Sequence, residues 1–171
     1  MFCFGRLAVS VEDVDFVDPA LADQPDVRER GARVELRPVK AVDVNDASIY
    51  ASQTVTGGPA MCRLDFLESA PHAADRMHWH PAMARGEPDE RTFDEALSAD
   101  PIGWLRTRLI DGAAFLRDAG VSDPRPYEAD LAALAAGADD VVAQVERVLE
   151  RARRPWPEAP ARDERGMALT T

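Results

Sequence analysis

The chain has 171 residues, of which 46% are hydrophobic and 30% are charged, and its formal net charge is −11 at pH 7. This size and composition predict one folded domain and exclude a wholly disordered chain. The acidic balance disfavours nucleic acid and anionic lipid as partners, because most of the surface would repel them.

The cellular compartment is predicted from the cysteines and from the first residues. Only Cys3 and Cys62 are present, which is too few for the disulfide framework of a small secreted domain. The first fifteen residues lack a basic stretch followed by an apolar one, so we expect no signal peptide. No run reaches the roughly 20 apolar residues of a membrane-spanning helix. These features predict a cytoplasmic protein.

Residues 1–31 are expected to form an irregular N-terminal segment with room for a short strand. Acidic residues are frequent from position 12 onward, and Pro19 and Pro25 interrupt the pattern. Such a composition is typical of a connection rather than of a regular element.

Residues 32–81 carry the short alternation of apolar and polar residues that is typical of antiparallel strands. The first of these strands is expected to break near Pro38. In the second, Ile49, Ala51 and Val55 would share a face before a turn at 56–59. The predicted strands have the sequences ARVELRPVKAVDV (32–44), ASIYASQTV (47–55), AMCRLDFL (60–67) and RMHWH (76–80).

From about residue 100 to 154 the period becomes helical and predicts three helices. The first would run from the N-cap Asp100 to Gly120, and the second from Asp123 to Gly137. The third, 138–152, has valines, alanines and one leucine at 3.6-residue spacing. One short helical turn is also expected at Asp94 and Glu95.

Strands followed by helices predict a single α+β domain over 32–154, with an antiparallel sheet of four to five short strands packed under the three helices. Residues 155–171 hold several prolines and no periodic apolar set. This Pro-rich tail is expected to be loosely ordered.

The most chemically suggestive motif is His78-Trp79-His80. Residues two apart on a strand share a face, so both imidazoles would stand side by side. If 60–67 and 76–80 pair as a hairpin, one register places Asp65 opposite His78 and Arg63 opposite His80.

Two histidines and a carboxylate are the ligands of many catalytic zinc and non-haem iron sites. The sequence therefore suggests a divalent metal, zinc, iron or manganese, bound by His78, His80 and Asp65. Arg63, Asp65 and Arg76 are candidate ligand-binding residues on the same face. Other nearby side chains that could complete the metal site are Glu68, His72, Asp75 and Glu87.

Other interpretations of the motif stay open. The histidines could belong to a solvated strand face, or one of them could act as a general base oriented by Asp65. The pair resembles the first metal-binding motif of cupins over fewer than ten residues. Glu87 comes too late for that motif and His80 is the last histidine, so the resemblance does not assign the family.

We interpret the chain as a small protein with a polar pocket around the His-x-His strand. The alternative is a non-enzymatic interaction or structural module, in which helix 138–152 supplies a partner or homodimer surface. The two are distinguished by the shape of the histidine face and by whether Val141, Val145 and Val148 are covered by the protein's own sheet.

Overall fold

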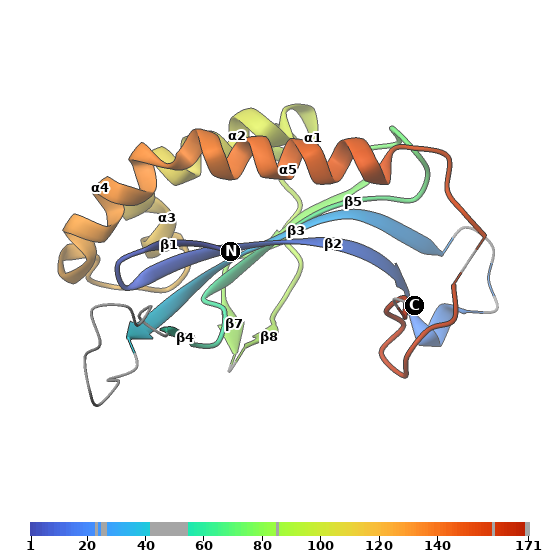
Figure 1. Ribbon diagram of the computed structural model, residues 1–171, viewed down its shortest axis with the longest axis horizontal. Coiled ribbons are helices and arrows are strands. Elements are labelled where there is room, and N and C mark those ends of the chain that lie inside the picture. Colours follow the sequence, from blue (N-terminus) through green and yellow to red (C-terminus); the bar gives the residue numbers. More distant parts are fainter. Residues whose placement is uncertain (23, 25–26, 42–54, 85, 159, 170–171) are drawn as a thin grey trace, which may run out of the picture.

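The computed structural model describes residues 1–22, 24, 27–41, 55–84, 86–158 and 160–169. Helices cover one face of an antiparallel sheet, and a short hairpin lies beyond the opposite face (Figure 1). The predicted α+β class is therefore confirmed. None of the described helices is both long and apolar enough to cross a membrane.

The main sheet has six strands among the described residues. Five of them lie side by side in the order β1-β2-β3-β5-β6, and β4 pairs with the C-terminal end of β3. A separate two-stranded hairpin comprises β7 (Met83–Ala84) and β8 (Glu87–Pro88). The strands of the main sheet are β1 (Phe2–Phe4), β2 (Leu7–Val17), β3 (Arg28–Ala41), β4 (Val55–Gly57), β5 (Cys62–Glu68) and β6 (Arg76–His80).

The N-terminal segment is more regular than its sequence suggested. Instead of an irregular stretch, residues 7–17 form the long strand β2, and Pro19 begins a short 3₁₀ helix, η1 (Pro19–Leu21). The acidic residues suggested an irregular segment, but their partners lie on β3. Asp15 pairs with Arg28 at 2.5 Å and with Arg30 at 3.3 Å. The sheet is therefore larger than predicted.

Strand β3 continues through Pro38, where a break was expected. Proline lacks an N–H and is tolerated where a strand does not need that ladder bond. Pro38 lies where β3 changes partner, since pairing with β5 ends at Leu36 and pairing with β4 begins at Val39. The strand predicted over 47–55 lies outside the described residues except for Val55, which begins β4.

The helices are more divided than predicted. The region 100–120 breaks at Asp111, whose backbone leaves the helical conformation (φ −91°, ψ 58°) and whose side chain caps the next helix. The second predicted helix starts at Glu128 rather than Asp123, which instead accepts a hydrogen bond from the Arg125 N–H. The helical elements are α1 (Glu95–Ala99), α2 (Pro101–Ile110), α3 (Gly112–Asp118), η2 (Arg125–Tyr127), α4 (Glu128–Ala136) and α5 (Ala138–Ala152).

Helix α5 agrees with its predicted range and packs along the sheet (Figure 1). Val141, Val145 and Val148 are all buried against the protein's own core. The apolar face of α5 is therefore occupied within the chain, so the idea of a homodimer surface on this helix loses its main support.

The C-terminal tail contacts the sheet where it is described. It pairs with the edge of β2 beyond β1, through hydrogen bonds from the Val17 N–H to the Gly166 carbonyl (3.0 Å) and from the Ala168 N–H to the Asp15 carbonyl (3.0 Å). Gly166 has a φ of +82°, and a Cβ there would lie 1.8 Å from the Val17 carbonyl oxygen. A periodic pattern of apolar residues in the sequence cannot predict such contacts, because each is a single backbone hydrogen bond.

Asp15 anchors this tail by accepting a hydrogen bond from Arg162 at 2.7 Å, and it also accepts one from Arg28 of β3. We predict that Asp15→Asn lowers the free energy of unfolding by about 1–3 kcal/mol, because the three guanidinium groups of Arg28, Arg30 and Arg162 lose a charged partner. It should also increase protease cleavage of residues 155–169. Urea unfolding and limited proteolysis measure the two effects.

The effect of Asp15→Asn should depend on pH. Burial alone would raise the pKa of Asp15, but its bonds to Arg28 and Arg162 lower it below 3.8. The stabilisation is therefore present above about pH 4 and is lost as the pH falls through the folded-state pKa. Asp13→Asn, on the same strand, is the control and should cost no more than about 0.5 kcal/mol, since Asp13 pairs with Arg151 in a half-exposed position. An equal loss in both variants would contradict the anchoring role.

Candidate metal centre

The candidate site lies on the sheet face that points away from the helices. Strand β5 pairs with β6 so that Asp65 is opposite His78 and Arg63 is opposite His80, which confirms the predicted register. On its other side, Asp65 is opposite Arg33 of β3. Three neighbouring strands therefore place Arg33, Asp65 and His78 in one row.

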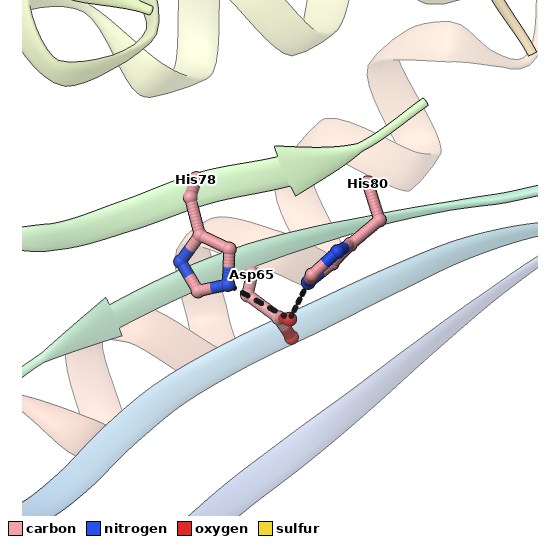
Figure 2. A group of neighbouring side chains, drawn as sticks. All are labelled: Asp65, His78 and His80. Atoms are coloured by element: carbon pink, nitrogen blue, oxygen red, sulfur yellow. Dashed lines mark ion pairs between the residues drawn. The ribbon is translucent and has the colours of Figure 1, made fainter. Parts of the chain in front are cut away.

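Both imidazole rings point from β6 toward the Asp65 carboxylate (Figure 2). The Nε2 atoms of His78 and His80 lie 3.5 Å and 3.6 Å from Asp65 Oδ2. All three side chains are buried, each with no more than 4% of the residue surface exposed. The potential ligand atoms all lie within 4.8 Å of one another.

The backbone determines which nitrogen of each ring carries its proton. His78 Nδ1 lies 2.9 Å from the Arg76 carbonyl oxygen, and His80 Nδ1 lies 2.8 Å from the Asp89 carbonyl oxygen. A carbonyl only accepts hydrogen bonds, so both Nδ1 atoms must donate. In the neutral tautomer each Nε2 therefore presents a lone pair to Asp65, as metal-binding histidines do.

Asp65 is held in its charged form. Its Oδ1 accepts a hydrogen bond from Arg33 Nε at 2.8 Å, which leaves Oδ2 facing the histidines. Burial would raise the pKa of Asp65, but His80 and Arg33 outweigh that effect and lower the pKa to about 2. The carboxylate is thus ionised at neutral pH.

His78 is held in its neutral form. Burial lowers its pKa below 6.5, and the nearby charge of Arg91 acts in the same direction. The Arg76 carbonyl and Asp65 act the other way, but they do not compensate fully. A neutral imidazole and an ionised carboxylate are the protonation states that a metal ion requires.

A polar cavity of about 700 Å³ opens onto these three side chains. Its floor includes Arg33 and Arg63, and its other walls come from β2, the β7–β8 hairpin and the C-terminal segment. The histidine face is therefore hollow and partly shielded, which is the shape expected for a ligand-binding site and not for a flat solvated strand face.

A second cluster of ion pairs lies beside the candidate ligands, and Arg63 of this cluster lines the cavity floor. Glu35 is almost fully buried on β3, accepts a hydrogen bond from Arg63 at 2.8 Å and pairs with Arg37. Arg63 therefore lines the cavity as predicted, but its guanidinium is already engaged by a carboxylate.

The remaining predicted residues are distributed differently. Arg76 lines a neighbouring cavity of about 310 Å³ with Glu29 and Arg91, and not the cavity of the histidines. Arg76 lies two residues before His78 on β6, opposite Leu67, and its role as a ligand-binding residue stays a prediction.

Of the four side chains suggested to complete the site, only Glu87 lines the cavity. Glu68 accepts hydrogen bonds from Arg153, which follows α5, and from the His72 backbone N–H. Asp75 accepts a hydrogen bond from the Ser69 hydroxyl. Cys62 is buried on the core face, where burial raises the pKa of its thiol to about 12, so it is unsuited to act as a nucleophile.

The sequence interpretation missed the contributions of β3 and of the connection after β8. Arg33 holds Asp65, and the Asp89 carbonyl orients His80. The alternation of Arg33 and Glu35 with apolar residues was a usable signal, since it places charges opposite Asp65 and Arg63. A carbonyl contact made by a loop has no such signal.

Comparison of the chain with protein-family models, with curated proteins and with solved structures gave no match. The site must therefore be interpreted from its own geometry.

The protonation states can be tested by NMR titration of the imidazole rings in metal-free protein. We predict that His78 titrates below pH 6.5, and that Asp65→Asn lowers its pKa further because the carboxylate charge favours imidazolium. By linkage, His78 should also make the fold less stable as the pH falls below about 6.5. Titration of His78 above pH 6.5 would contradict the neutral state.

Proposed function

We propose that this protein binds one divalent transition-metal ion through Asp65, His78 and His80. The observation that carries the proposal is the convergence of two Nε2 atoms and one carboxylate oxygen in a buried place. Without a cation, these three acceptors face one another with no hydrogen between them when both rings are neutral, which costs free energy.

The two nitrogen–oxygen distances suit such an ion. Ligand atoms about 2.0–2.1 Å from a tetrahedral zinc ion lie roughly 3.3–3.4 Å apart. The two observed nitrogen–oxygen separations of 3.5 Å and 3.6 Å require only a small contraction. The donor set also suits iron(II), which two histidines and one carboxylate bind with open positions, and manganese remains a candidate.

The surroundings support a site that is open to a ligand. Three protein ligands leave at least one coordination position free, as in catalytic rather than closed structural sites. Here all three candidate ligands line the cavity, from which a further ligand could approach. A bound ion would supply Lewis acidity or lower the pKa of a bound water, while Arg33 and the Arg76 and Asp89 carbonyls would keep the ligands in position.

The cytoplasmic location also remains a proposal. It is supported by two free cysteines, Cys3 and Cys62, since thiols persist in a reducing compartment.

The experiment that tests the proposal is elemental mass spectrometry on protein purified without an affinity tag. We expect near-stoichiometric zinc, iron or manganese in the wild type, and its loss from His78→Ala and His80→Ala. His72→Asn is the matched control, because it removes the remaining histidine outside the cluster. Metal absent from the wild type after incubation with each ion, or equal metal in all variants, would reject the site.

A second variant separates a metal site from a simple hydrogen-bond network. Arg33→Gln keeps a donor near Asp65 but removes the charge that holds its other oxygen. We expect metal affinity to fall about tenfold to a hundredfold, the usual effect of losing such a supporting contact. A competition titration with a coloured chelator measures this change, and an unaltered affinity would contradict the role of Arg33.

A further inference from the structure

The cavity contains two kinds of arginine. Arg33 and Arg63, on its floor, are bound to Asp65 and Glu35. Arg91 and Arg165 also line the cavity but are exposed, and neither forms an ion pair with any residue that the structure describes. Free guanidinium groups at a cavity wall are available to a ligand.

Both free arginines belong to segments that the fold holds in place. Arg91 follows Asp89, whose carbonyl accepts the His80 Nδ1–H, and precedes Thr92, which exchanges backbone hydrogen bonds with Trp79 of β6. Arg165 precedes Gly166, which is bonded to β2. The two groups therefore approach the same cavity from different segments, one after β8 and one in the C-terminal tail.

The charge of the lining indicates what the cavity would accept. Five carboxylates and four guanidinium groups line it, so with neutral histidines a bound divalent ion would give a net charge of plus one. This charge suits a ligand with a single negative charge. A carboxylate fits the free arginines in particular, since a guanidinium can donate two parallel hydrogen bonds to it.

We propose that the metal-loaded cavity binds a small monocarboxylic acid. Its carboxylate lies on Arg91 and Arg165, and a second oxygen, from a hydroxyl or carbonyl group, approaches the metal. This inference rests on the proposed metal site and adds the chemical class of its ligand.

The test is isothermal titration calorimetry of the full chain loaded with zinc or manganese. The probes are glycolate, lactate and pyruvate, and lactamide is the comparison because it replaces the charged carboxylate of lactate with a neutral amide. We expect at least one acid to bind, and lactamide to bind at least about tenfold more weakly than lactate, since hydrogen bonds to a charged group contribute that much.

The variant Arg91→Gln/Arg165→Gln should keep its metal and lose at least about tenfold in affinity for the acid. The control variant is Arg147→Gln, which should bind the acid like the wild type. Arg147 is an exposed arginine of α5 that donates a hydrogen bond to Gln144. Metal content is measured in every sample.

Two results would overturn the inference while leaving the metal site intact. One is loaded protein that binds none of the three acids, and the other is an affinity that the double arginine variant does not change. In the second case the carboxylate would sit on the metal itself. Failure of the wild type to hold any ion would reject the proposed function, and the carboxylate site with it.

Discussion

The register that places Arg33, Asp65 and His78 in one row across β3, β5 and β6 determines what this face of the sheet can do. A slip of one residue would turn every side chain of a strand to the other face. The register is fixed by the apolar row beside it, where Phe66 is opposite Met77 and both are buried under the helices. Packing on one face of the sheet therefore positions the side chains of the candidate site on the other face.

The buried carboxylate explains why the row has this composition. An ionised Asp65 would be costly to bury alone, and Arg33 compensates only one of its oxygens. The second oxygen faces the Nε2 atoms of two imidazoles whose Nδ1–H groups donate to backbone carbonyls. When both rings are neutral, the arrangement has an excess of acceptors at one point, and a cation is the partner that such a point lacks.

Sequence patterns predicted much of this arrangement because the β5–β6 hairpin is local and strictly alternating. Cys62, Leu64 and Phe66 alternate with Arg63 and Asp65, so the pairing of Asp65 with His78 followed from a choice between few registers. Arg33 was not predicted because its partner lies 32 residues away along the chain. The Asp89 carbonyl and the docked tail were missed because single backbone contacts leave no periodic signal. Strand β2 was missed because its charges are neutralised by a neighbouring strand and not by solvent.

The most direct test of the account is a crystal structure of the protein soaked with zinc, with data collected on both sides of the zinc absorption edge. We predict one strong anomalous peak about 2.0–2.2 Å from Nε2 of His78, Nε2 of His80 and Oδ2 of Asp65. The Nδ1 contacts to the Arg76 and Asp89 carbonyls should be retained. An empty site at saturating zinc, or an ion bound through Nδ1 with the rings turned over, would contradict the claim that the backbone prepares these two histidines for a metal.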